Sequence, residues 1–266
     1  MKPVAFRYER PETVEEAVAL LAEHGDDAKV LAGGQSLVPA LNMRLIRPAV
    51  VVDINRVRDL DNASDDDGRC CIGATVRQAD PRVVEHPLLA EAVPHIGHFA
   101  TRNRGTVCGS IAHADPAGEL PLCLVLLGGA ARAVSAEGER TIPAAELFHG
   151  HFATALEPTE LVAATIWPRP QPGWGYAFEE FSQRRGDYGL CMAAAAAGNG
   201  ELRVAVGSVA NRPTLLDVDP GQPGESAAAQ VEPWGNLHAS PAYLEQLVRV
   251  LVDRAVARAR AGSEAA

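Results

Sequence analysis

The chain has 266 residues, of which 47% are hydrophobic and 22% are charged, and its formal net charge at pH 7 is -10. This length and composition are typical of a folded protein with more than one core, and they exclude extensive disorder. The acidic balance argues against a nucleic-acid partner, because a phosphate backbone is bound by a basic surface.

The first 56 residues are predicted to alternate strand, helix, strand, helix and strand. The pattern favours helices from Thr13 to Gly25 and from Leu37 to Leu45, and strands at Val30–Leu31 and Val50–Ile54. Thr13 is a typical N-cap residue, and glycine commonly ends a helix. This order is typical of a small α/β unit with parallel strands.

A glycine-bearing loop lies between the second strand and the second helix, at Ala32, Gly33, Gly34, Gln35, Ser36 and Leu37. Adjacent glycines lack the Cβ atoms that hold a ligand away, and successive backbone N–H groups can solvate a phosphate. Ser36 is placed to cap the helix that follows. The alternative interpretation is a tight strand-to-helix turn that binds no ligand.

From residue 57 to 170 the predicted elements are mixed. The acidic stretch Asn62–Gly68 is most simply a solvated hairpin tip. A metal-binding loop is not favoured, because the stretch lacks the alternating ligand spacing of a calcium loop. A strand is expected at Arg69–Ala74, the start of a helix at Thr75–Asp80, and a helix at Leu88–Gly97. Further elements are a helix at Glu119–Leu127 and strands at Ala131–Val134 and Leu161–Trp167.

A second loop of small residues lies in this region, at Thr106, Val107, Cys108, Gly109 and Ser110. Its hydroxyls and N–H groups form another surface rich in hydrogen-bond donors. Two such loops suit a cofactor that carries a pyrophosphate.

The segment Pro168–Gly173 is predicted to be a linker, because its prolines and glycine stop both helix and sheet. Beyond it, the pattern predicts strands at Trp174–Ser182, Cys191–Ala197 and Leu202–Val209, a loop at Asp217–Pro233 and an amphipathic helix at Pro241–Arg260.

The sequence carries neither a targeting signal nor a metal-binding motif. We expect a cytoplasmic protein without membrane insertion, because neither a signal-peptide pattern nor a long apolar run occurs. The five cysteines lack the paired spacing of a zinc or iron–sulfur site, so free thiols are expected.

With both loops located, the chain resembles the FAD-binding medium subunit of the molybdenum hydroxylases, the carbon monoxide dehydrogenase and xanthine dehydrogenase group. The resemblance is carried by motifs in order along nearly the whole chain: Ala32-Gly-Gly-Gln-Ser-Leu37, Ile96-Gly-His, the run Arg102–Pro121, Arg184-Arg-Gly-Asp-Tyr188, and the helix around Tyr243. A lone glycine pair would be weak evidence, but an ordered series is specific.

The resemblance implies an α+β fold. Two N-terminal α/β subdomains, residues 1–56 and 57–170, would form an FAD-binding (PCMH-type) domain, and residues 174–266 a C-terminal domain of a small antiparallel sheet with helices. The pyrophosphate of a non-covalent FAD would lie on the two loops. Other FAD contacts implied by the family are the acidic Glu119 at the ribose end, the apolar Ile96 and Val162, and Tyr188 near the isoalloxazine ring.

Cys108 departs from the family pattern, which has a glycine there, so a side chain is expected near the cofactor. The alternative interpretation of Tyr188 is ordinary packing without a contact to the cofactor. Asp115 is interpreted as a cap for the Glu119 helix rather than a base, and His113 as a structural histidine rather than a proton-transfer group.

The resemblance further implies that a large subunit carries a molybdenum cofactor and hydroxylates the substrate. A small subunit with [2Fe–2S] clusters would pass electrons to this chain's FAD, which would reduce an external acceptor. The assembly would be a heterotrimer that can dimerise, and this chain would supply no catalytic side chain. The alternatives are a stand-alone flavoprotein oxidase, reductase or electron carrier, and a scaffold subunit that has lost its flavin.

Overall fold

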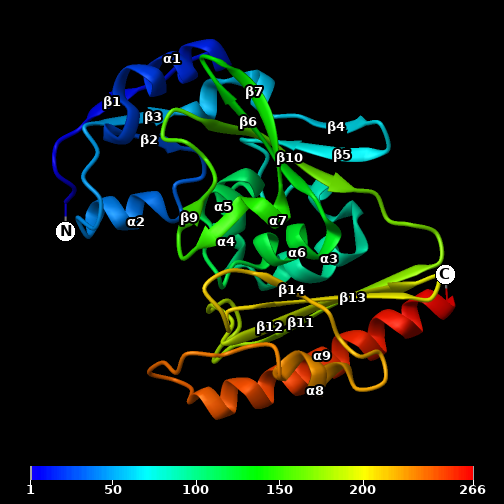
Figure 1. Cartoon of the computed structure of the whole chain (residues 1–266). Coiled ribbons are helices and arrows are strands. Elements are labelled where there is room, and N and C mark those ends of the chain that lie inside the picture. The colour runs from blue at the N-terminus through cyan, green and yellow to red at the C-terminus, as the bar shows by residue number, and fades with distance from the viewer. Residues whose placement is uncertain (1, 266) are drawn as a thin grey trace.

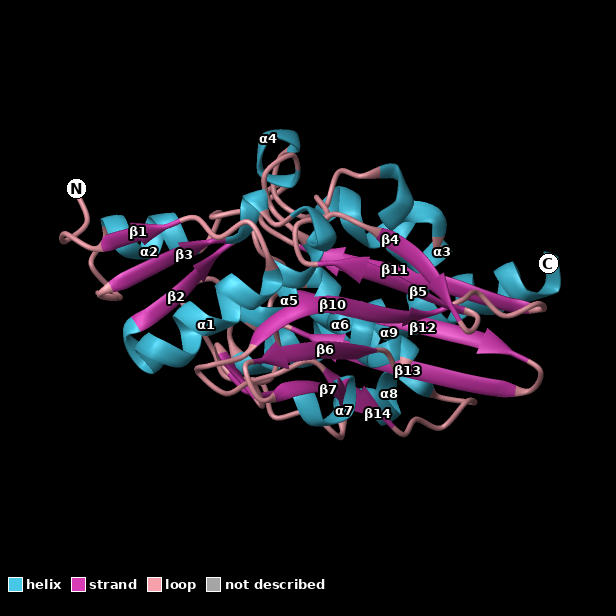
Figure 2. Cartoon of the chain, turned by 90° about the horizontal axis from the view of Figure 1, so that it is seen from above, coloured by secondary structure: helices cyan, strands magenta, loops and turns pink. Residues whose placement is uncertain are grey.

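The computed structural model describes residues 2–265, which form alternating layers of sheet and helix (Figure 1). A small N-terminal sheet lies at one end of the molecule, beside a larger middle sheet (Figure 2). Helices of the middle region separate this sheet from a C-terminal sheet, whose far side is covered by two further helices. The predicted α+β class is confirmed.

The N-terminal sheet is parallel, as predicted, with the strand order β1–β3–β2. Its elements are β1 (Arg7–Glu9), α1 (Val14–His24), β2 (Ala28–Leu31), α2 (Leu37–Asn42) and β3 (Val50–Asp53). Thr13 caps α1 as expected, because its hydroxyl accepts a hydrogen bond from the Glu16 N–H at 3.1 Å. The second helix is shorter than predicted, and Arg44 beyond it has a left-handed φ of 58°.

The middle sheet is antiparallel, with the order β4–β5–β10–β6–β7. Its strands are β4 (Ala63–Asp66), β5 (Arg69–Gly73), β6 (Ala130–Ser135), β7 (Gly138–Pro143) and β10 (Leu161–Pro168), and β8 (Phe148–Gly150) and β9 (Ala153–Thr154) form a separate hairpin. The helices are α3 (Pro87–Ala92), α4 (Phe99–Arg102), α5 (Val107–His113), α6 (Glu119–Leu127) and α7 (Ala144–Leu147). The hairpin predicted at Asn62–Gly68 is confirmed, but its tip is only Asp67 and Gly68, because residues 63–66 form β4 itself.

Two predictions in this region are wrong in part. Residues 75–80 form turns instead of the start of a helix, because their backbone is held by the second loop: the Gln78 N–H donates to the Gly105 carbonyl at 2.9 Å. The helix predicted to reach Gly97 ends at Ala92 and continues as a 3₁₀ turn. Pro94 in this turn has no N–H with which to continue an α-helix.

The C-terminal sheet is antiparallel and its strands follow in chain order, close to the predicted ranges. Its elements are β11 (Trp174–Phe181), β12 (Cys191–Gly198), β13 (Glu201–Gly207), β14 (Thr214–Leu216), α8 (Pro223–Ala228) and α9 (Pro241–Ala265). The segment predicted as a loop thus contains α8, whose small residues allow close packing on α9. The Gly224 N–H donates to the Asp253 carboxylate on α9 at 2.8 Å.

The alanine run of β12 is a strand although alanine favours helices. Ala193, Ala195 and Ala197 pack in the core beneath α9, whereas Ala194 and Ala196 pack in the core shared with the middle region. All five are at most 4% exposed, so the strand is buried on both faces. Only small side chains fit where two layers of helices approach one strand so closely, and tertiary packing therefore overrides local propensity.

One core cluster continues from α1 through the middle region to β12 and β13. The predicted units 1–56, 57–170 and 174–266 contain the N-terminal, middle and C-terminal sheets, respectively. The boundaries between these units stay a prediction. No helix within the described residues combines the length and apolar character needed to cross a bilayer.

Gly175 on β11 tests the packing of α9. A Cβ there would overlap the Ala259 carbonyl oxygen and lie 2.5 Å from the Ser263 nitrogen. We predict that Gly175→Ala lowers the free energy of unfolding by about 1–3 kcal/mol, the usual cost of overpacking a core. Urea unfolding measures this, and Gly150→Ala, with no atom nearer than 3.9 Å, is the control. Equal losses in both variants would contradict the close packing.

Candidate functional site

The two glycine loops are in direct backbone contact. The first follows β2. The second, predicted at residues 106–110, is a loop only in part, because Val107–Ser110 form the first turns of α5; residues 103–106 connect α4 to α5 and make the contact with the first loop. A Cβ on Gly33 would overlap the Arg104 carbonyl oxygen and lie 2.7 Å from the Gly105 Cα. The fold therefore brings together two segments that are far apart in the sequence, and only glycine at position 33 allows this approach.

The first loop presents backbone donors that the described part of the chain does not use. The N–H groups of residues 33–36 have no hydrogen-bond partner within residues 2–265. Gly34 has a φ of 72°, a conformation that a glycine adopts without strain. The Gln35 amide donates to the Gly33 carbonyl at 3.1 Å, so this side chain folds back on the loop. Ser36 precedes α2 but its side chain makes no capping bond, so the capping prediction is wrong.

The second loop is shaped by Thr106 and Gly109. The Thr106 hydroxyl caps α5 by accepting a hydrogen bond from the Gly109 N–H at 3.0 Å. A Cβ on Gly109 would lie 2.6 Å from that hydroxyl oxygen. Glycine at this position therefore preserves the cap, while Ser110 is half-buried on the first turns of the helix.

Cys108 does not place its side chain beside a ligand, contrary to the expectation from the sequence. The residue is 2% exposed, and its thiol donates to the Ile72 carbonyl at 3.2 Å within the core. Burial raises the pKa of this thiol to about 12, so the unreactive thiol form predominates. Val107 is fully buried as well, so both residues can reach a ligand through the backbone alone.

Glu119 is a buried acid at the start of α6, 5% exposed. Burial and, secondarily, the Glu180 carboxylate raise the pKa of Glu119 to about 8. Glu180 lies on β11, and its Oε1 is 3.7 Å from Nδ1 of His95. Ile96 follows His95 and is 8% exposed. Two predicted contacts, Glu119 and Ile96, thus lie near an ionisable pair in which the Glu180 side chain is buried and His95 is partly exposed.

Tyr188 lies in the loop between β11 and β12 and is 62% exposed. Partial burial of the phenol and the nearby carboxylates of Asp115 and Glu119 raise its pKa to about 12. Asp115 accepts a hydrogen bond from the Ala117 N–H at 2.9 Å. It therefore shapes the turn before α6, and Gly118, not Asp115, occupies the N-cap position.

The loop of Tyr188 packs on the segment next to Ile96. A Cβ on Gly186 would lie 2.8 Å from the His98 ring and 3.0 Å from the Gly97 carbonyl oxygen. Tyr188 and Ile96 therefore belong to neighbouring segments. Val162 lies in β10, 5% exposed, in the same core cluster as Val107 and Cys108.

His113 packs against Phe152, with 4.9 Å between the ring centroids, and burial lowers its pKa. These contacts agree with a structural histidine. Residues 2–265 contain no group of three or more His, Cys, Asp or Glu side chains arranged to hold a metal ion.

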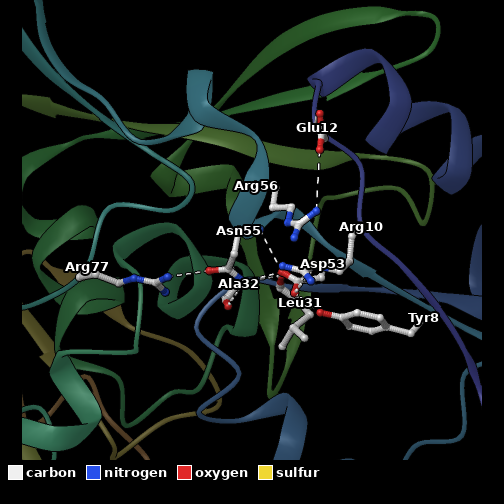
Figure 3. A network of polar contacts seen from close by, with 9 residues as sticks. All are labelled: Tyr8, Arg10, Glu12, Leu31, Ala32, Asp53, Asn55, Arg56 and Arg77. Atoms are coloured by element: carbon white, nitrogen blue, oxygen red, sulfur yellow. Dashed lines mark hydrogen bonds and ion pairs between the residues drawn. The ribbon is translucent and has the colours of Figure 1, made fainter.

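The sequence reasoning missed Asn55, which contacts the first loop, and Arg77, which contacts the segment before α5; Figure 3 shows the hydrogen bond between them. The Arg77 guanidinium donates to the Asn55 side-chain oxygen and to the Arg104 carbonyl, both at 2.6 Å. Neither residue belongs to a glycine motif, so no signal in the chain pointed to them.

The raised pKa of Glu119 predicts a pH-dependent stability. In the unfolded chain Glu119 titrates near its ordinary value of 4.5, and in the folded chain near 8. Between these pH values the folded state binds the Glu119 proton more tightly than the unfolded state does. Protonated Glu119 therefore contributes fully to the free energy of unfolding below about pH 4.5, and this contribution is lost as the pH rises to about 8. We predict that Glu119→Gln is more stable than the wild type at pH 8 by a few kcal/mol, on the basis of about 1.4 kcal/mol per pKa unit.

Chemical unfolding of the FAD-free protein at several pH values between 4.5 and 8.5 measures this difference. It should shrink towards zero at the acidic end. Glu201→Gln is the control, because that side chain is 62% exposed. A stability difference that does not change with pH would contradict the assignment of a buried, protonated Glu119.

Comparison with known proteins agrees with these features. Residues 4–170 match the family model of the FAD binding domain in molybdopterin dehydrogenase. The chain is 41% identical to the 6-hydroxypseudooxynicotine dehydrogenase complex subunit alpha of Paenarthrobacter nicotinovorans, over 97% of this chain and 96% of that protein. It is 32% identical to the carbon monoxide dehydrogenase medium chain of Afipia carboxidovorans, over 98% and 99%.

Solved structures show the same fold. Carbon monoxide dehydrogenase from Hydrogenophaga pseudoflava matches with a TM-score of 0.93 and 31% identity, covering 98% of this chain and 99% of that chain. Quinoline 2-oxidoreductase from Pseudomonas putida 86 matches with a TM-score of 0.91 and 33% identity, covering 99% of both chains. The resemblance predicted from the motifs is confirmed: the chain belongs to the family of FAD-binding medium subunits of multi-subunit molybdenum hydroxylases.

Proposed function

We propose that the two glycine loops of this chain bind the pyrophosphate of a non-covalent FAD. The observation that carries this proposal is their backbone contact, which brings Gly33, the first of four residues whose N–H groups are unpaired in the described residues, against Arg104 and Gly105. An anion is the ligand that such a row of donors favours. The proposed contacts are Ala32, Gly33, Gly34, Gln35, Ser36 and Leu37 on the first loop, and Thr106, Val107, Cys108, Gly109 and Ser110 on the second.

Further features fit the same ligand. The side-chain oxygen of Gln78 is buried without a hydrogen-bond partner in the described residues, and a Cβ on Gly105 would lie 2.5 Å from it. Glycine at position 105 therefore leaves room for the Gln78 side chain. A buried acceptor is costly unless a donor completes it, and a hydroxyl of the bound cofactor or a water would supply that donor, because the pyrophosphate itself only accepts.

Glu119, Ile96, Val162 and Tyr188 are proposed to contact the remaining parts of the cofactor. Glu119 is mostly protonated at pH 7, because its pKa is about 8. A neutral acid can both donate and accept hydrogen bonds, as a ribose hydroxyl requires. The exposed ring of Tyr188 offers a flat apolar surface on which an isoalloxazine could pack.

We further propose that electrons reach this chain from the [2Fe–2S] clusters of a small subunit and leave to an external acceptor. A large subunit with the molybdenum cofactor would oxidise the substrate, and the three chains would form a heterotrimer. Bound FAD supplies the redox chemistry, and the protein supplies its position and electrostatic surroundings. In support, relatives are named as medium chains or complex subunits, and one similar structure is a Cu,Mo-CO dehydrogenase.

The first test compares two glycines that share the same φ. Gly34 and Gly68 both have a φ of 72°, a value at which alanine is strained. A Cβ on Gly34 would also lie 3.0 Å from the Leu31 side chain, whereas Gly68 has no atom within 4 Å. We predict that Gly34→Ala weakens FAD binding by about tenfold or more, a loss of 1.4 kcal/mol, and that Gly68→Ala does not.

Titration of the FAD-free protein with FAD, followed by visible absorbance, measures both variants. Full flavin affinity in Gly34→Ala would overturn the pyrophosphate assignment. Unfolding curves on the same samples report the strain that the two substitutions share.

The second test concerns the partners. We predict that the tagged chain, purified at low salt from its native host, carries flavin and brings down two further chains that contain iron and molybdenum. Metal analysis and absorbance of the purified material measure this. A flavin-bearing chain that purifies alone would instead favour the stand-alone flavoprotein.

A further inference from the structure

The two glycine loops are joined by a side-chain bridge as well as by backbone contact. The first loop extends from the parallel N-terminal sheet, whereas the second belongs to the middle region. Their spacing must match a pyrophosphate if both are to contact it. The first loop follows a strand of the N-terminal sheet, and the second lies beside helices of the middle region. Hydrogen bonds within one sheet therefore cannot fix the distance between the loops. The groups that connect the two loops must fix it.

Asn55 holds the first loop. It lies in the 3₁₀ turn Ile54–Arg56 that follows β3, and its side-chain amide donates to the Ala32 carbonyl at 2.8 Å. The same nitrogen lies 2.5 Å from Oδ1 of Asp53 and 3.4 Å from the Leu31 carbonyl oxygen. The amide therefore fixes the point at which the chain leaves β2 and enters the glycine loop (Figure 3).

Arg77 holds the second loop and reaches the first. Its Nη1 donates to the Arg104 carbonyl and its Nη2 to the Asn55 side-chain oxygen, both at 2.6 Å. The Arg104 carbonyl oxygen is also the atom that faces Gly33. The planar guanidinium therefore contacts the carbonyl at which the two loops meet, and its fixed fork sets the distance to Asn55.

Both ends of this bridge are anchored. The turn that carries Arg77 is hydrogen-bonded to the second loop on either side, through Gln78 N–H to the Gly105 carbonyl and Val107 N–H to the Val76 carbonyl. At the other end, Asp53 is buried, accepts the Asn55 N–H at 3.0 Å and is hydrogen-bonded to the Tyr8 hydroxyl.

Charges of both signs lie near the bridge. Burial and, secondarily, the neighbouring Arg104 guanidinium lower the pKa of Arg77, and the carboxylates of Asp61 and Asp53 partly offset this. Although burial opposes it, hydrogen bonds from Tyr8 and Asn55 lower the pKa of Asp53, which stays ionised. A pyrophosphate beside the loops would compensate the repulsion between the two arginines.

We propose that Asn55 and Arg77 act as one unit, the Asn55–Arg77 latch, which positions the two glycine loops at the spacing that a pyrophosphate requires. The inference rests on the proposed function, because it assumes FAD as the ligand. Both are positioning residues, since they act through the loops. The latch is anchored through Asp53, and disrupting either member should release the same constraint.

The test is a double-mutant cycle on FAD affinity, with Asn55→Leu, Arg77→Met and the double variant titrated with FAD in the FAD-free full-length chain. We expect each single variant to bind FAD about tenfold more weakly than the wild type, and the double variant to bind about as weakly as either single one. Arg77→Lys, which keeps the charge but not the fork, should lose most of the same affinity.

Arg56→Met is the matched control. Arg56 is the next residue after Asn55, is 52% exposed and pairs with Glu12 at 3.8 Å, away from both loops. Its FAD affinity should stay within about twofold of the wild type, as for other exposed pairs.

A further readout separates positioning from general damage. Flavin bound at saturation to the latch variants should show the wild-type visible spectrum, because the latch acts on the pyrophosphate end. A general loss of structure would change both the spectrum and the unfolding midpoint. If a variant does not fold, Arg77→Lys provides the decisive comparison.

The outcomes separate the two proposals. A wild-type chain that binds no FAD would overturn the proposed function itself. A wild-type chain that binds FAD, with latch variants that bind equally well, would overturn the latch alone. Strictly additive losses in the double variant would also overturn it, because the two residues would then act independently.

Discussion

The structure depends on one close approach, between Gly33 and the Arg104 carbonyl. No side chain can stand between these backbones, so the loop after β2 and the loop before α5 form one continuous surface. The N–H groups of residues 33–36 have no partner in the described residues, although the Gln35 and Asn55 side chains donate to the carbonyls of Gly33 and Ala32. The unpaired donors of residues 33–36 therefore lie on a surface that residues 104–105 complete, and we propose that a phosphate-bearing cofactor binds there.

The layers around this contact supply rigidity and a low dielectric. The helices between the middle and C-terminal sheets share one core, which continues into the even-numbered alanines of β12. This packing buries Glu119 and the Glu180 side chain in a region that solvates charge poorly. The same packing that fixes the loops therefore also controls the protonation of an acid proposed to contact the cofactor. If Glu119 contacts the cofactor as proposed, fold stability and cofactor binding would be linked through these groups.

Several differences between the predicted and observed elements have a common origin. The residues 75–80 have a helix-like pattern but form turns, because the second loop takes up their backbone hydrogen bonds. Residues 223–228 look like part of a loop but form α8, because α9 offers a surface on which small residues pack. Cys108 looks like a ligand contact but points into the core. In each case a partner distant in sequence decided the local structure, and local patterns carry no information about such partners.

The sequence by itself determined the order of most strands and helices, the two glycine loops and the family, because periodicity, turn residues and motif spacing are local properties. It also located Glu119, Ile96 and Tyr188 through the family motifs. Only the tertiary structure decided that the loops touch, that Glu119 has Glu180 as a neighbour and that Asn55 and Arg77 join the loops. These facts depend on contacts between different sheets. The energies that select such contacts, burial and hydrogen bonding between distant segments, have no signature in any single stretch of residues.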